Sequence, residues 1–157
     1  MPNRHLSTAA VGAIAAGMAF CTLDSPLWGP WASGAYAKSV RRASKPAQIR
    51  KVTECELPHV RFEFAGVTAF AFAPLPYTGW PRELRRLQVS GLDERSDDTA
   101  RTLSIGDGPN IVLNKDVDMT TGKTTSQVAH ALVAWLEQNS EAERAQWLAA
   151  PGNSLSV

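Results

Sequence analysis

Two short stretches after residue 58 alternate hydrophobic and polar residues, the pattern of a strand with one buried face. Val60, Phe62 and Phe64 alternate with charged residues, which predicts a strand that carries its apolar side chains on one face. A second strand is expected over residues 67–73, and the short link between the two favours a β-hairpin. Three further short strands are predicted at residues 84–90, 99–105 and 110–114.

The hydrophobic period changes near residue 125 from that of a strand to that of a helix. Apolar residues then recur at the spacing of one helical face, at Val128, Ala131, Leu132, Trp135 and Leu136. Thr124 or Thr125 is expected to cap this helix, and Asn139 to lie at its end. Ser140 followed by Glu143 has the form of a capping box, which predicts a second short helix that ends near residue 150.

The first third of the chain has neither pattern outside an Ala-rich segment at residues 7–20. We therefore predict an α+β fold: a small, mostly antiparallel sheet with one or two C-terminal helices packed on it, preceded by an extended N-terminal arm. The expected division is an arm or linker over residues 1–58, an α+β domain over 59–150 and a flexible tail over 151–157.

Composition limits the architecture to one domain and gives no strong overall charge. The chain has 157 residues, of which 44% are hydrophobic, enough for one ordinary core. Lys and Arg number 16 and Asp and Glu 15, a net charge of +1, so no global field favours nucleic acid or anionic lipid. A local basic tract at residues 38–51 lacks interleaved aromatic residues, which makes nucleic acid an unlikely partner on this reading.

The cysteines and the N-terminal segment bear on the cellular compartment of the protein. Cys21 and Cys55 are too few for a disulfide framework and fit no metal-site spacing, which favours reduced thiols. No run of roughly 18 strongly apolar residues is present, so no membrane span is predicted. The sequence Ala35-Tyr36-Ala37 has the form of a signal-peptidase site, so an exported protein whose signal peptide is residues 1–37 stays an alternative.

No catalytic, cofactor-binding or metal-binding residue is predicted. The run Gly122-Lys123-Thr124-Thr125 is similar to the end of a P-loop, but Val117 stands where that motif needs its earlier glycine. Its simpler interpretation is a turn with a threonine cap. Asp116 and Asp118 form only part of a calcium loop, and the three histidines lie far apart in the sequence.

Candidate contact residues lie in the N-terminal third and on the first strand. Trp28 and Trp31 stand in a turn-rich stretch that cannot build its own core, so they are expected to meet either a neighbouring subunit or their own domain. Both alternatives stay open. The predicted interface residues are Trp28, Trp31, Tyr36, Arg41, Arg42, Phe62 and Phe64.

The second half of the chain resembles a module of tailed-bacteriophage structural proteins. The segments concerned are Leu87-Gln88-Val89-Ser90, residues 102–105, Asn110-Ile111-Val112-Leu113, the Gly122-Lys123-Thr124-Thr125 turn and residues 126–135. In that module, strands followed by a Thr-Thr-x-x-Gln-Val-type cap lead into an Ala-rich helix.

This resemblance implies a non-catalytic virion subunit, of a capsid or a tail, that is assembled in the host cytoplasm. Its partners would be other virion proteins and copies of itself, reached through the arm and the sheet edge. It would have no cofactor and no small-molecule substrate. The alternative is a small exported envelope protein, cleaved after Ala37, that binds a partner.

Overall fold

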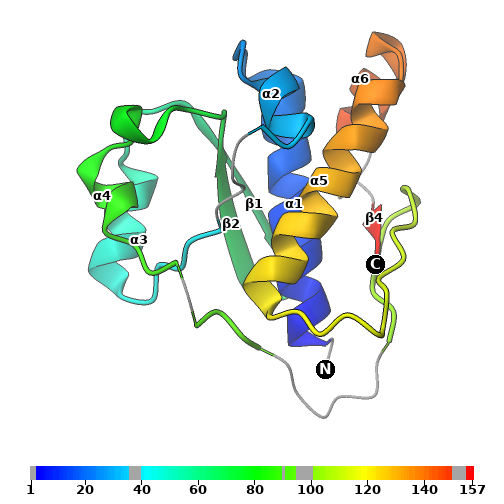
Figure 1. Cartoon of the computed structure of the whole chain (residues 1–157), viewed down its shortest axis with the longest axis horizontal. Coiled ribbons are helices and arrows are strands. Elements are labelled where there is room, and N and C mark those ends of the chain that lie inside the picture. The colour runs from blue at the N-terminus through cyan, green and yellow to red at the C-terminus, as the bar shows by residue number, and fades with distance from the viewer. Residues whose placement is uncertain (1–2, 36–39, 90, 95–100, 150–154) are drawn as a thin grey trace.

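The computed structural model describes residues 3–35, 40–89, 91–94, 101–149 and 155–157. Its helices are α1 (Arg4–Thr22), α2 (Trp28–Ala32), α3 (Pro46–Thr53), α4 (Arg82–Arg85), α5 (Thr121–Gln138) and α6 (Glu141–Ala149), with one 3-10 turn at Tyr77–Gly79. Its strands are β1 (His59–Phe64), β2 (Val67–Phe72), β3 (Ser104–Ile105) and β4 (Leu155–Ser156). Figure 1 shows α1 and α5 side by side, the β1–β2 hairpin next to α1, and α3 with α4 beyond the hairpin.

The N-terminal segment is a core helix and not an extended arm, so the arm prediction is wrong. Asn3 caps α1 by accepting a hydrogen bond from the Leu6 N–H at 3.2 Å. Ala9, Ala13 and Ile14 are fully buried against α5 and the hairpin. A helix that is covered on most sides carries no polar stripe, so the Ala-rich pattern of residues 7–20 did not distinguish a core helix from part of an arm.

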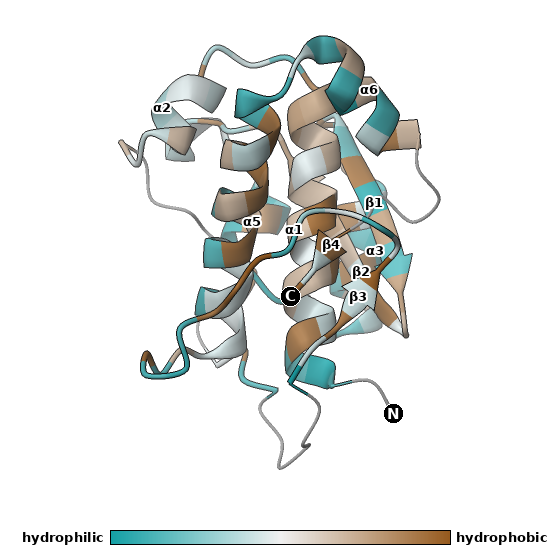
Figure 2. Ribbon diagram, turned by 90° about the vertical axis from the view of Figure 1, so that its right-hand side faces the viewer, coloured by the Kyte–Doolittle hydropathy of each residue, from teal (hydrophilic) through white to brown (hydrophobic). Residues whose placement is uncertain are grey.

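Glycines let α1 lie close to its neighbours. A methyl group at Gly12 would overlap with Cγ2 of Thr125, and one at Gly17 would lie 2.9 Å from Cη2 of Trp147. The small residues of α1 therefore admit α5 and α6 at short range. Figure 2 shows the hydrophobic stretches of α1 and α5 next to each other, whereas α6 carries both hydrophilic and hydrophobic residues.

Within the described part of the chain, α1 is also the one helix long and apolar enough to cross a membrane by length and composition. A buried core helix and a signal sequence have that same composition. In this structure α1 is the core helix, because its buried side chains join those of α5, β3 and β4. Cleavage after Ala37 and a domain boundary at residue 58 remain predictions.

The β1–β2 hairpin agrees with its prediction. The two strands pair antiparallel with Phe62 opposite Ala69, and Ala65 and Gly66 both have positive φ, the geometry of a tight two-residue hairpin turn. Phe62 and Phe64 pack on the core around α1. The aromatic residues of β2, Phe70 and Phe72, pack instead on a second small core around α3 and α4.

The three later strands were mostly mispredicted. Residues 82–85 form α4, and the buried Leu84 and Leu87 have the i, i+3 spacing of a helical turn rather than the alternation of a strand. Within the fourth predicted strand, residues 99–105, the structure has a strand over the two residues of β3. In the fifth, Asn110 makes one isolated bridge to Ser156.

The C-terminal helices agree more closely with expectation. The predicted cap at Thr124 or Thr125 is wrong, because α5 begins at Thr121 with Thr120 as its N-cap, and the Thr125 hydroxyl donates back to the Thr121 carbonyl inside the helix. The Ser140 N–H donates to the Glu143 carboxylate at 2.7 Å, so the predicted capping box is present. This hydrogen bond is the main cause that lowers the pKa of Glu143.

Two details of this region differ from the sequence pattern. Trp135, predicted to lie on the buried face of the helix, is 37% exposed. The chain end is not a loose tail over residues 155–157, because Leu155 is fully buried and pairs with Ile105. The fold is thus α+β with helices at both ends of the sequence.

Candidate functional site

A pocket of about 280 Å³ opens between the first turn of α1, the loop after residue 112 and the first turn of α5. Six of the nine residues that line it are polar or charged, which suits a site that handles a polar ligand. The lining residues are His5, Leu113, Asn114, Lys115, Asp116, Val117, Asp118, Met119 and Thr124.

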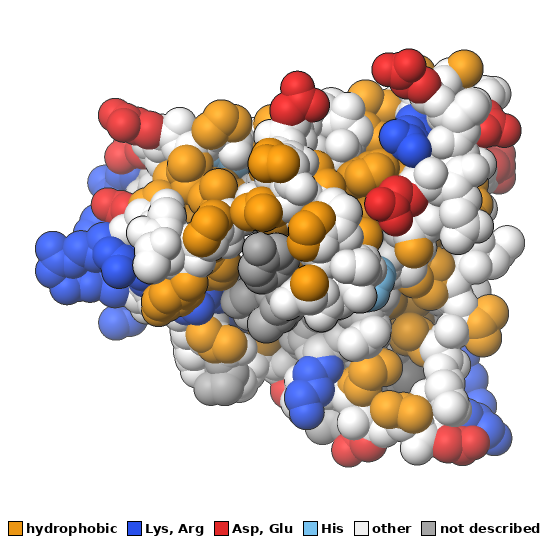
Figure 3. Space-filling model, turned by 45° about the horizontal axis from the view of Figure 1, so that its top comes forward, with side chains coloured by type: hydrophobic (Ala, Val, Ile, Leu, Met, Phe, Trp, Pro, Cys, Tyr) orange, Lys and Arg blue, Asp and Glu red, His pale blue; other side chains and the backbone are white. Residues whose placement is uncertain are grey.

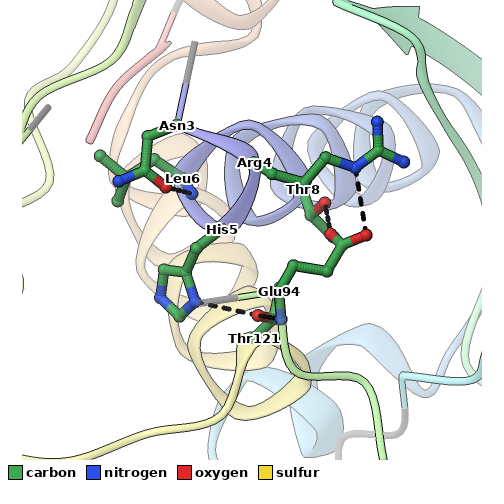
Figure 4. A network of polar contacts seen from close by, with 7 residues as sticks. All are labelled: Asn3, Arg4, His5, Leu6, Thr8, Glu94 and Thr121. Carbon is green, nitrogen blue, oxygen red and sulfur yellow. Dashed lines mark hydrogen bonds and ion pairs between the residues drawn. The ribbon is translucent and has the colours of Figure 1, made fainter. Parts of the chain in front are cut away.

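His5 is held in place by the start of α5. Its Nδ1 lies 2.9 Å from Oγ1 of Thr121, a residue that is fully buried. The Glu94 N–H donates to the same hydroxyl at 2.7 Å (Figure 4). Three segments that are distant in sequence therefore meet at one threonine hydroxyl, which fixes the orientation of the imidazole.

Glu94 links this junction to α1. Its carboxylate pairs with the Arg4 guanidinium at 3.1 Å and accepts a hydrogen bond from the Thr8 hydroxyl. The Gly122 N–H at the start of α5 donates to the Leu92 carbonyl at 3.1 Å. One of the first amides of α5 is therefore already bonded within the protein, and Gly122 lies in a helix rather than in a phosphate-binding loop.

The loop that forms the opposite wall is shaped by a turn of its own. Oδ1 of Asn114 accepts a hydrogen bond from the Asp116 N–H at 3.0 Å, and the Asn114 carbonyl accepts one from the Val117 N–H at 3.2 Å. Asparagine commonly stabilises turns in this way. The loop leaves Lys115 exposed at the pocket, and Lys123 is exposed on the first turn of α5.

The described residues give little support for a metal site or for a cysteine nucleophile. In those ranges no group of three or more His, Cys, Asp and Glu side chains could hold a metal ion. Burial is the main cause that raises the pKa of the Cys21 thiol, which opposes a thiolate nucleophile at this position. Cys55 is a free thiol.

Two of the predicted interface residues lie together on α2. Trp28 is 8% exposed, and its indole N–H donates to the Leu23 carbonyl at 2.8 Å. Its ring packs edge-on against Phe20 and Trp31, and Trp31 contacts the His130 ring. Both tryptophans thus contact their own domain, which was the second of the two alternatives.

The other predicted interface residues are distributed over separate elements. The Arg41 guanidinium lies 4.8 Å from the centre of the Trp80 ring, and the Arg42 N–H donates to the Gln88 carbonyl. Phe62 and Phe64 are half-buried on β1. Tyr36 lies outside the described residues.

Sequence reasoning missed the residues that form this site. His5 and Thr121 are 116 positions apart, and Glu94 stands in a charged stretch that gave no motif. The local signals were Asp116 and Asp118, which match only part of a calcium loop, and the Gly122-Lys123-Thr124-Thr125 run, which we had interpreted as a turn. Their position at a pocket depends on where α1 lies.

Comparison with known proteins gives one match. Residues 110–154 match the family model described as "Peptidyl-tRNA hydrolase PTH2", which is 45 of the 157 residues. The matched segment holds the pocket loop, α5 and α6. No curated protein and no solved structure matches the chain.

This match contradicts the functional interpretation drawn from the sequence. The part of the bacteriophage-like segment from residue 110 onward matches a hydrolase family instead, so the virion assignment, shell or tail, is wrong. The expectation of a non-enzyme is wrong for the same reason. A family named for peptidyl-tRNA also contradicts the expected partners, which were other virion proteins and copies of this chain, with no small-molecule substrate and with nucleic acid an unlikely partner.

Proposed function

We propose that this chain hydrolyses peptidyl-tRNA and that the ester bond is cleaved in the pocket beside His5. One observation carries the proposal. Of the nine residues that line the pocket, every one except His5 lies within residues 110–154, the segment that matches the hydrolase family. The cavity and the matched segment therefore coincide.

To hydrolyse peptidyl-tRNA, the protein has to place a water molecule next to the ester bond of the substrate. In peptidyl-tRNA an ester joins the carboxyl carbon of the peptide to a ribose oxygen of the RNA. A water oxygen adds to that carbon, the carbon–oxygen bond to the ribose breaks, and the ribose oxygen takes a proton. A general base that removes the proton from water accelerates the first step.

His5 is our candidate for this base. Imidazole accepts and returns a proton readily near neutral pH. The Thr121 hydroxyl already accepts the Glu94 N–H, and its second lone pair can accept an N–H from Nδ1 of His5. In that tautomer Nε2 is the basic nitrogen, and the bond to Thr121 keeps the ring facing the pocket.

Lys115 and Lys123 are candidates for substrate contacts. Lys115 lines the pocket, and Lys123 precedes the pocket residue Thr124 on the first turn of α5. Both side chains are exposed, as contacts with the phosphates of a large RNA require. An ammonium group binds a phosphate as a compact point charge.

Filling the pocket tests the proposal. Val117 lines the cavity, and we expect Val117→Trp to lower kcat/KM for peptidyl-tRNA by about 10²-fold, since a misplaced ester loses much of the advantage of orientation. Initial rates of peptide release measure the effect. Val112→Trp is the matched control, because Val112 is 91% exposed and does not line the pocket. Equal rates for the two variants would place the reaction elsewhere.

A further inference from the structure

The end of the molecule built on α3 and α4 is strongly basic. We define the α3–α4 lobe as residues 40–58 and 77–88. These residues include eight Lys and Arg and three Glu, a net charge of +5, while the whole chain has a net charge of +1. Figure 3 shows a cluster of Lys and Arg side chains at this end.

No cation of the lobe forms an ion pair with another described residue. The two ion pairs that join described residues to each other are Arg4 with Glu94 and Arg61 with Glu63, and neither lies in the lobe. Most of its cations are exposed, namely Arg42, Lys45, Arg50, Lys51, Arg82, Arg85 and Arg86. Such a surface attracts polyanions over several ångströms at physiological salt.

The fold keeps these cations in a fixed arrangement. Val52 of α3 packs with Leu84 and Leu87 in the second small core, which holds the two helices together. The Arg41 guanidinium donates to the Arg85 and Leu87 carbonyls at 3.2 Å and lies over the Trp80 ring. Arg41 thus has a structural role, while the other basic side chains extend from a rigid base.

An exposed aromatic ring lies beside this surface. Tyr77 is 58% exposed, and its ring centre lies 5.6 Å from that of Trp80, the ring that Arg41 covers. The basic tract in the sequence lacked an aromatic residue, but the fold brings one to it from the 3-10 turn. Cations next to an exposed aromatic ring are the combination that binds unpaired nucleotides.

We infer that the α3–α4 lobe is a binding surface for the phosphate backbone of RNA. The choice of tRNA as that RNA rests on the proposed function, whereas the surface lies outside residues 110–154 and makes no use of the pocket. The lobe would hold the body of the tRNA while the ester occupies the pocket. Anionic lipid is the competing ligand for such a surface, and the experiment separates the two.

The test measures the binding of deacylated tRNA to the full chain by fluorescence anisotropy over a range of salt concentrations. The variant Arg82→Gln/Arg86→Gln is expected to weaken binding roughly tenfold near 0.1 M salt and to reduce the slope of log K against log salt by about 1 to 2. The matched control, Arg61→Gln/Arg101→Gln, removes the same charge outside the lobe and is expected to leave both values near those of the wild type. Thermal unfolding checks that each variant is folded.

The possible results distinguish the RNA-binding proposal for the lobe from the hydrolase proposal for the pocket. Equal tRNA binding by the lobe variant and its control would overturn the lobe inference and leave the hydrolase proposal intact. A wild-type chain that binds tRNA through the lobe but does not hydrolyse peptidyl-tRNA would support the lobe and overturn the hydrolase proposal. Lobe-dependent binding to phosphatidylserine vesicles without binding to tRNA would overturn the RNA inference.

Discussion

Replacing His5 by glutamine is expected to lower kcat for peptidyl-tRNA hydrolysis by about 10²- to 10⁴-fold, the usual contribution of a general base. Glutamine can keep a hydrogen bond to Thr121, but it cannot take a proton from water. We expect KM to change little, because the imidazole acts on water and not on the tRNA. Steady-state rates over a range of substrate concentrations measure both constants.

The matched control is His59→Gln. Nδ1 of His59 lies 2.8 Å from the Leu57 carbonyl, and the ring packs on Phe70 and Phe72 away from the pocket. The pH profile adds a readout that a structural role would not change. The rate of the wild type should rise as an imidazole loses its proton, and His5→Gln should lack that rise. A His5→Gln variant with the wild-type rate and profile would exclude His5 as the base.

Ile14→Ala is expected to lower the free energy of unfolding by about 2–5 kcal/mol, the cost of truncating a fully buried aliphatic side chain. Ile14 is 0% exposed at the centre of α1, where it belongs to the core formed with α5. Denaturant-induced unfolding measures the change. A loss of this size would establish that α1 supports the fold.

Ile49→Ala is the control for the same chemical change at the surface. Ile49 is 44% exposed on α3, so we expect a change below about 1 kcal/mol. If the two variants lost the same stability, α1 would not be part of the core, and the prediction of an arm or a removable signal segment would regain support.

Local patterns predicted the elements whose partners are near in sequence. The hairpin follows from the alternation in β1 and from the Ala65-Gly66 link. The start of α6 follows from Ser140 and Glu143, whose reciprocal hydrogen bonds involve residues three positions apart. In both cases the determining contacts lie within a few residues, so a single sequence contains the information.

Contacts between distant segments could not be predicted in the same way. β3 and β4 are two-residue strands that pair across most of the second half of the chain, and neither is long enough to give an alternating pattern. The Ala-rich pattern of α1 did not predict a core helix, because a helix that is covered on several sides lacks a polar stripe. Without α1 in its place, His5 could not be assigned to the pocket.

The resemblance to a virion module shows a further limit of local pattern. An Ala-rich helix preceded by threonines is stable because of helix propensity and packing. The same pattern therefore occurs in unrelated folds. The Gly122-Lys123 run was likewise compatible with a turn. The run lies within residues 110–154, which match a hydrolase family, and its Thr124 lines the pocket.

Peptide release from an N-blocked peptidyl-tRNA by the full chain, in water enriched in ¹⁸O, tests the central claim most directly. We expect a small amount of protein to release many equivalents of peptide, with ¹⁸O in the peptide carboxylate and none in the ribose, because water adds to the carboxyl carbon. Release no faster than in the absence of protein, or ¹⁸O in the ribose hydroxyl, would contradict the proposal.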